Sequence, residues 1–265
     1  MKLEVHIFEP QEHTQNCTLL FLHGMAHAAW CFEWEFVPFF NQKGFRCITM
    51  SLRGHGGSEG RENLRWWRIR DYLTDLKSVL ETIPHPVVLI AHSMGGFVAQ
   101  KLLLEKYNIQ GMVLLSAIPA TGMWRGSLKT ARHFPLKFIK GNLTLSTAPF
   151  SETEFAVRTL CFSESINSNR LKQTKERLQP ESYMAYLDML FLDLHHPSPS
   201  QTPTLFLHAK NDFLLGAAAI EKTAKGFGGE FISIPNLAHD MMIDTDWKIA
   251  ADCILTWIAH QKRIT

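Results

Sequence analysis

Seven short apolar runs that alternate with helical patterns constrain the fold of this chain more than any other feature of its sequence. Several read as nearly continuous apolar runs, which is typical of strands buried on both faces of a parallel sheet. The segments 67–83, 96–107 and 245–260 instead repeat apolar residues every three or four positions, as amphipathic helices do. The alternation predicts an α/β fold with a doubly wound, mostly parallel sheet. The predicted strands are 3–8, 18–22, 45–51, 87–91, 112–116, 204–208 and 230–234.

The alternation stops between about residues 120 and 202, where no run reads as a buried strand. This part has helical stretches around 153–161 and 171–194, broken by prolines, and it ends in the turn-rich sequence HHPSPSQTP. We therefore expect residues 121–202 to form a helical cap inserted over one edge of the sheet. Residues 1–120 and 203–265 are expected to form the core.

Composition and charge narrow the classes of protein. The 265 residues are 46% hydrophobic and 20% charged, which suits a globular chain with a large core. A net charge of +2 is too balanced to favour nucleic acid as a partner. Five scattered cysteines favour a reducing compartment, the cytoplasm. The polar N-terminus lacks the apolar run of a signal peptide, and no segment approaches the roughly 18 apolar residues of a membrane span.

A serine stands at the turn from strand to helix within PVVLIAHSMGGFVAQKLL, residues 86–103. Ala91 and Gly95 lie two positions either side of Ser93, and a sharp turn crowded by neighbouring strands requires small residues there. Such a turn exposes the hydroxyl at the carboxyl edge of the sheet, beside the free N–H groups of the helix. The ordinary alternative is a serine that caps a helix. The coincidence of strand, turn and Gly-Gly favours a nucleophile.

A nucleophilic serine needs a base and a group that orients the base, and the ends of other parallel strands are where both are expected. Asp212 follows the strand 204–208, and His239 follows the strand 230–234 and leads into the final helix. Asp188 and Asp193 are weaker candidates because they lie in the expected cap. The order serine, aspartate, histidine is the one this topology requires. We therefore predict Ser93, Asp212 and His239 as a catalytic triad.

The oxyanion of such a site needs N–H donors. A His-Gly pair, His23-Gly24, follows the strand 18–22 and permits a backbone turn toward the serine. We assign the backbone N–H groups of Met25 and Met94 to this role. His23 itself is expected to be structural.

These motifs together resemble the α/β-hydrolase superfamily. The matching residues are LHG at 22–24, RGHGGS at 53–58, AHSMGG at 91–96, Asp212 and the pair His239-Asp240. SLRGHGGSEG and HSMGG look like the branch of lysophospholipases, monoacylglycerol lipases and carboxylesterases. The resemblance implies that His239 takes the Ser93 proton, that an acyl-enzyme forms, and that neither a metal nor an organic cofactor takes part. The short N-terminal region suggests that an antiparallel edge strand of fuller members is missing.

The substrate pocket is less constrained by the sequence. Apolar cap residues such as Trp124, Phe138 and Met184 suit an apolar acyl or aryl group, and His27 and Trp30 follow the oxyanion turn. Packing within the cap or the core is the alternative for each of them. The basic, apolar stretch 121–140 suits either an anionic lipid surface or a solvated face, and the second is more common.

The leading hypothesis is a serine hydrolase that cleaves small-molecule carboxylic esters. The same triad also serves lactones, thioesters, carbon–carbon bonds or perhydrolysis. A non-catalytic binding protein on this fold is the alternative from another class. The sequence leaves open the physiological ester, the movement of the cap and the oligomeric state.

Overall fold

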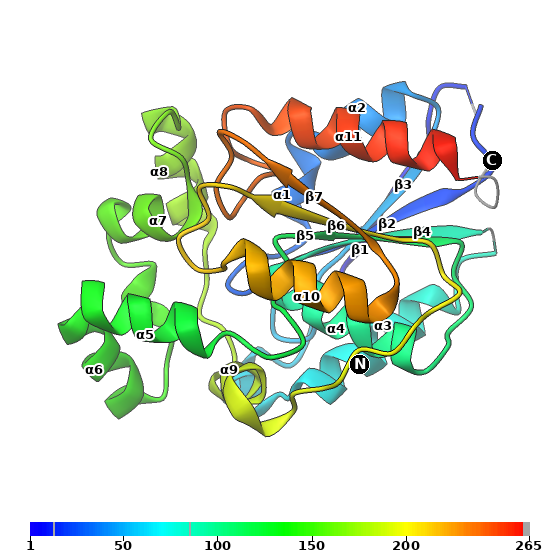
Figure 1. The fold of residues 1–265 in the computed structure, drawn as a ribbon. Coiled ribbons are helices and arrows are strands. Elements are labelled where there is room, and N and C mark those ends of the chain that lie inside the picture. The colour runs from blue at the N-terminus through cyan, green and yellow to red at the C-terminus, as the bar shows by residue number, and fades with distance from the viewer. Residues whose placement is uncertain (13, 85, 262–265) are drawn as a thin grey trace.

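The computed structural model describes residues 1–12, 14–84 and 86–261, and these form one seven-stranded sheet with helices on both faces (Figure 1). Each strand overlaps one of the seven predicted runs. The strands are β1 (Val5–Phe8), β2 (Thr18–Leu22), β3 (Arg46–Met50), β4 (Val87–His92), β5 (Gly111–Leu115), β6 (Thr204–Ala209) and β7 (Glu230–Ile234).

The strand order is β1-β3-β2-β4-β5-β6-β7, and every neighbouring pair except β1 with β3 is parallel. The carboxyl ends of six strands therefore meet at one edge of the sheet. The order reverses direction between β2 and β4, and such a switch point is where α/β sheets open a crevice for ligands. The antiparallel edge strand is present as β1, so the expectation that it is missing was wrong.

Two layers of helices cover the sheet, with α1, α2 and α11 on one face and α3, α4 and α10 on the other (Figure 1). Their bounds are α1 (Trp30–Glu33), α2 (Phe36–Gln42), α3 (Ile69–Leu80), α4 (Ser93–Leu104), α10 (Ala217–Phe227) and α11 (Trp247–His260), and a 3₁₀ helix, η1, spans Arg61–Trp66. Among the described residues, no helix has both the length and the apolar character needed to cross a bilayer.

The central strands are mostly apolar because both of their faces are buried. Along β2, Leu19 and Phe21 pack into the core beside α1, α2 and α11. Leu20 and Leu22 alternate with them and pack into the opposite core, beside α3 and α4. Successive side chains of a strand point to opposite faces, so one run of four apolar residues supplies both cores.

Between β5 and β6 the chain leaves the sheet and forms a group of short helices beyond the carboxyl edge (Figure 1). We call residues 121–202 the cap segment. The stretch 171–194 is not one helix: α8 ends before Pro180, and Ser182 caps a new helix by accepting from the Ala185 N–H. The elements are α5 (Trp124–His133), α6 (Pro135–Thr144), η2 (Ala148–Phe150), α7 (Glu154–Cys161), α8 (Ser168–Arg177), α9 (Tyr183–Leu187) and the π-helical turn η3 (Asp188–Leu192).

Candidate active site

Ser93 occupies a strained turn between β4 and α4. Its φ of +50° lies in the left-handed region, which costs a non-glycine residue roughly 1–3 kcal/mol and is typical of functional sites. Ser93 is the first residue of α4 and His92 is the N-cap, without a side-chain capping bond, so the serine does not act as a helix cap. A Cβ on Gly24 would lie 2.8 Å from the Ser93 Cβ, which shows how closely the two strand ends approach.

The three residues predicted at three strand ends meet around one histidine ring. The Ser93 Oγ lies 2.8 Å from the His239 Nε2, and the His239 Nδ1 lies 2.8 Å from the Asp212 Oδ2. The other oxygen of Asp212 accepts from the N–H groups of Leu214 and Leu215 at 2.8 and 3.0 Å. This hydrogen-bonded order gives the ring an acceptor face toward the hydroxyl and a donor face toward the carboxylate.

Burial and charge act in opposite directions on this pair. Burial by itself lowers the pKa of His239, but the charge of Asp212 and its hydrogen bond outweigh it and raise that pKa above the ordinary value. Burial raises the pKa of Asp212, whereas His239 and the two backbone N–H groups outweigh burial and lower it. Asp212 is therefore held as an anion that favours the protonated form of His239.

A second buried group lies behind His239. The Asp240 carboxylate lies 3.0 Å from the His27 Nε2, although the two are not aligned for a hydrogen bond. The His92 Nε2–H donates to the His239 carbonyl at 3.0 Å and so fixes the backbone of the base. Burial and the charge of His239 lower the pKa of His92 to about 3, so His92 stays neutral. Burial lowers the pKa of His27, but Asp240 outweighs it and raises that pKa.

The turn after β2 forms the opposite wall of the site. His23 is held by two bonds: its Nδ1–H donates to the Gly24 carbonyl at 2.8 Å, and its Nε2 accepts from the Leu52 N–H at 3.0 Å. Burial lowers the pKa of His23 well below its ordinary value, which fits this neutral, bridging form. Met25 lines the cavity at Ser93. The N–H of Met94 belongs to the first turn of α4, where helix N–H groups have no intrahelical acceptor.

A cavity of about 150 Å³ opens at Ser93 between the sheet edge and the cap segment. His27 and Phe138 line it, together with apolar cap residues such as Val157 and Leu160. Of the described residues that line the cavity, none is Trp30, Trp124 or Met184. These three sequence-based assignments to the pocket do not agree with the structure.

Each of the three has another position. Trp30 packs in the core and stacks on His27 with the ring centroids 5.4 Å apart. Trp124 is 48% exposed at the start of α5, where the guanidinium of Arg125 covers it. Met184 is half-buried within the short helix α9. Of the five residues proposed for the pocket, His27 and Phe138 line the cavity, and the sequence carried no signal that separates them from the other three.

The basic stretch 121–140 forms α5 and the first half of α6. Two of its lysines bond to the protein itself: the Lys129 Nζ donates to the Phe213 carbonyl and the Lys137 Nζ donates to the Pro149 carbonyl. Leu136 and Leu143 nonetheless leave about four-fifths of their surface exposed on α6.

One group among the described residues has the composition of a metal site: His92, His239 and Asp240, whose ligand atoms lie within 4.8 Å of one another. Both ring nitrogens of His239 already face Ser93 and Asp212. A metal ion on His239 would therefore replace one of these two contacts.

Sequence reasoning missed the buried polar groups that surround the site, above all Glu181 of the cap segment. His92 and Asp240 stood beside predicted site residues in the chain, which was a signal of their location. Glu181 carried no such signal, because its contacts with the core are with residues more than a hundred positions away.

Comparison with known proteins agrees with this architecture. The family model described as serine aminopeptidase, S33 (Hydrolase_4) matches residues 13–246. The chain belongs to this family of α/β-hydrolases. The family is one of hydrolases, and the mostly parallel sheet with helices on both faces is the fold of that superfamily.

Individual relatives of this hydrolase are distant. "Putative non-heme bromoperoxidase BpoC" of Mycobacterium tuberculosis is 30% identical over 117 residues, which cover 44% of this chain and only 41% of that protein. pFDCC methylesterase MES16 of Arabidopsis thaliana is 25% identical over 207 residues, 74% of this chain and 76% of that protein. The solved monoacylglycerol lipase of Paleococcus ferrophilus has a TM-score of 0.73 at 18% identity, with 97% and 98% of the two chains covered.

Proposed function

We propose that this hydrolase cleaves carboxylic esters through an acyl-enzyme on Ser93. The observation that carries the proposal is the continuous hydrogen-bonded order from the Ser93 Oγ through His239 to Asp212, at 2.8 Å for each step. An acyl-enzyme mechanism needs an exposed serine, a base within reach of its proton, and a carboxylate that fixes the tautomer of the base.

In this mechanism the Ser93 Oγ attacks the ester carbonyl while its proton passes to the His239 Nε2. The resulting imidazolium is stabilised by Asp212, whose charge favours the protonated ring. The oxyanion is stabilised by the N–H groups of Met25 and Met94, each worth about 3 kcal/mol in comparable sites. His239 gives the proton to the leaving alcohol, which leaves the acyl group on the Ser93 Oγ. A water molecule then attacks the acyl-enzyme while His239 takes its proton. His239 returns that proton to the Ser93 Oγ as the acid is released.

The cavity supports a small or medium apolar acyl or aryl group. Most of its lining surface is apolar, and Phe138, Val157 and Leu160 contribute to it. Apolar protein cavities of about 150 Å³ are large enough to bind a benzene molecule. The relation to a methylesterase supports ester chemistry for this chain.

The test uses p-nitrophenyl esters with acyl chains from acetate to dodecanoate. We expect the highest kcat/KM for short and medium chains and at least a 1,000-fold lower kcat for Ser93→Ala, on the order of the loss seen when a triad nucleophile is removed. A fluorophosphonate should label wild type and leave Ser93→Ala unlabelled. An enzyme that neither hydrolyses these esters nor takes up the label would contradict the proposal.

The same residues serve neighbouring reactions, so the screen includes a lactone, a thioester and an aminoacyl p-nitroanilide. A preference for one of these over all esters would keep Ser93 as nucleophile and replace the substrate class. Binding of an ester without turnover would support the alternative of a non-catalytic binding protein. The partner that we propose is a small-molecule ester, in the reducing compartment favoured by the cysteine pattern.

A further inference from the structure

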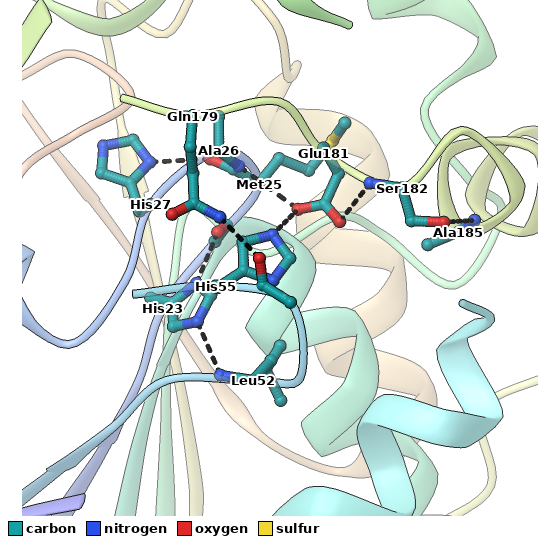
Figure 2. Close-up of polar contacts among 12 residues, drawn as sticks. His23, Met25, Ala26, His27, Leu52, His55, Gln179, Glu181, Ser182 and Ala185 are labelled. Atoms are coloured by element: carbon teal, nitrogen blue, oxygen red, sulfur yellow. Dashed lines mark hydrogen bonds and ion pairs between the residues drawn. The ribbon is translucent and has the colours of Figure 1, made fainter. Parts of the chain in front are cut away.

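The cap segment contributes a fully buried carboxylate, Glu181, to a network beneath the turn after β2 (Figure 2). One oxygen, Oε2, accepts from the Ala26 N–H at 3.2 Å and lies 3.0 Å from the His55 Nε2. The other oxygen, Oε1, accepts from the Tyr72 hydroxyl and the Ser182 N–H, both at 2.7 Å. A buried carboxylate is costly unless its oxygens are satisfied, and here both are.

The cap segment holds the Ala26 residue from two sides. Glu181 accepts from its N–H, and the Gln179 N–H donates to its carbonyl at 3.0 Å. Ala26 has a φ of +62°, a left-handed conformation that is unfavourable for alanine without external support. Ala26 directly follows Met25, so the bond from the Ala26 N–H to Glu181 fixes the Met25–Ala26 peptide plane, which adjoins the plane of the Met25 N–H. The bond to the Ala26 carbonyl fixes the next plane, between Ala26 and His27.

The same cap residues are anchored on the core. The Gln179 side chain donates to the Gly54 carbonyl and accepts from the Gly56 N–H, each at 3.1 Å. Burial raises the pKa of Glu181, but His55, Tyr72 and the Ser182 N–H outweigh it and lower that pKa, so the carboxylate remains charged. A charged acceptor forms a stronger hydrogen bond with a backbone N–H than a neutral one does.

We propose that Glu181 is a positioning residue that, through the Ala26 N–H, holds the Met25 N–H in the geometry of the oxyanion hole only while the cap segment is docked. The inference rests on the function proposed above. It makes the cap a part of the catalytic geometry as well as a wall of the pocket. Displacement of the residues 179–181 would remove both supports of Ala26 and relax the left-handed turn beside Met25.

The test compares Glu181→Ala and Glu181→Gln with matched variants of Asp188. Asp188 is a second buried carboxylate of the cap segment, which accepts from the Ile69 N–H at 3.0 Å and pairs with Arg68, away from the turn after β2. Asp188→Ala and Asp188→Asn therefore loosen the docking of the cap without removing a contact to Ala26. Glu181→Gln preserves the shape of the side chain and remains informative if Glu181→Ala does not fold.

We expect both Glu181 variants to lower kcat by at least about 10-fold. The loss should not exceed the roughly 10²–10³-fold that removal of a whole oxyanion-hole donor costs, and KM should change less than 3-fold. The affinity for an alkylboronic acid, which forms a tetrahedral adduct with the Ser93 Oγ, should fall by the same factor as kcat/KM. The affinity for the product acid should not change. A merely structural role would lower the melting temperature without this difference between the two ligands.

The outcomes separate the two proposals. Wild-type turnover with an unchanged kcat in the folded Glu181 variants overturns the positioning role alone. Asp188 variants that lose kcat to the same extent also overturn it, because the effect would then come from general loosening of the cap. A wild-type enzyme without turnover or labelling overturns the proposed function, and the positioning role falls with it.

Discussion

At the scale of single residues, the chemistry of the site depends on how charges are arranged around His239. The ring is almost fully buried, and burial alone would keep it neutral. Asp212 outweighs burial, because a carboxylate at 2.8 Å stabilises the imidazolium in a low-dielectric site. His239 must nonetheless be neutral to accept the Ser93 proton, so its pKa sets the acidic limit of activity.

We predict that kcat/KM falls as the pH drops through a His239 pKa above 6.5, the ordinary value. Asp212→Asn removes the charge that raises this pKa, so the acidic limb should move to lower pH while kcat falls by about 10²–10⁴-fold. Rate profiles from pH 5 to 9 measure both effects. Asp252→Asn, which alters an exposed pair with Lys248, is the control. An acidic limb that stays in place in Asp212→Asn would show that another group controls it.

The residues that meet at the strand ends were predictable because the topology of a parallel sheet brings its carboxyl ends together. Ser93, Asp212 and His239 each follow a strand that is visible in the sequence. The role of Glu181 was not predictable, because its partner Ala26 lies 155 positions earlier in the chain and the two meet only when the cap segment docks on the core. A local pattern carries no information about such a contact.

At the scale of elements, the approach of β2 and α4 depends on the absence of side chains. A Cβ on Gly95 would collide with the His23 carbonyl and lie 2.8 Å from the Leu22 carbonyl, and backbone atoms cannot rotate away as a side chain can. The glycine at this position therefore sets the distance between the serine turn and the turn after β2.

We predict that Gly95→Ala lowers the free energy of unfolding by about 1–3 kcal/mol, the range for overpacking. A glycine-to-alanine change within a helix ordinarily stabilises by up to about 1 kcal/mol, so the collision reverses the usual sign. The control is Gly216→Ala, where a Cβ meets nothing within 4 Å and the change affects only the N-cap residue of helix α10. Urea unfolding measures both variants, and equal stability in the two would contradict the steric argument.

The elements of the core were largely predictable, because strands buried on both faces are continuous apolar runs and helices there show one apolar stripe. The cap segment was not, because its helices are short and bury only part of their surface on one another. The predicted helical stretch 171–194 divides at Pro180, and the end of α9 continues as a π-helical turn. Pro180 and the capping Ser182 are local signals for the division, whereas the π-helical turn was not predicted from the sequence pattern.

At the scale of the whole molecule, the packed layers bury several histidines in surroundings that do not stabilise the protonated imidazolium. Burial lowers the pKa of His23 well below its ordinary value and, with neighbouring cations, lowers those of His92 and His195 to about 3. His92 and His195 therefore remain neutral in the folded chain at pH 5, and burial opposes the protonation of His23 in the same way. In the unfolded chain they take up protons as the pH falls below about 6.5.

We predict that stability is lost as the pH falls from 6 to 5. The unfolded state binds up to three more protons than the folded state, so the free energy of unfolding should decrease by at most about 4 kcal/mol per pH unit. His27 and His239 have raised pKa values, so their stabilising contribution grows as the pH falls through those values and is present in full well below 6.5. Below pH 6 they are protonated in both states and contribute no slope.

Urea unfolding at pH 7, 6 and 5 measures this dependence, and His195→Gln isolates one of the three protons. The His195 Nε2–H donates to the Gln100 side chain at 3.1 Å, and a glutamine amide at position 195 retains a donor but does not titrate. The slope between pH 6 and 5 should therefore fall by about 1.4 kcal/mol per pH unit in this variant. A wild-type chain that is equally stable at pH 6 and pH 5 would mean that the buried histidines gain protons without unfolding. In that case the neutral His92 assigned behind the base would also be wrong.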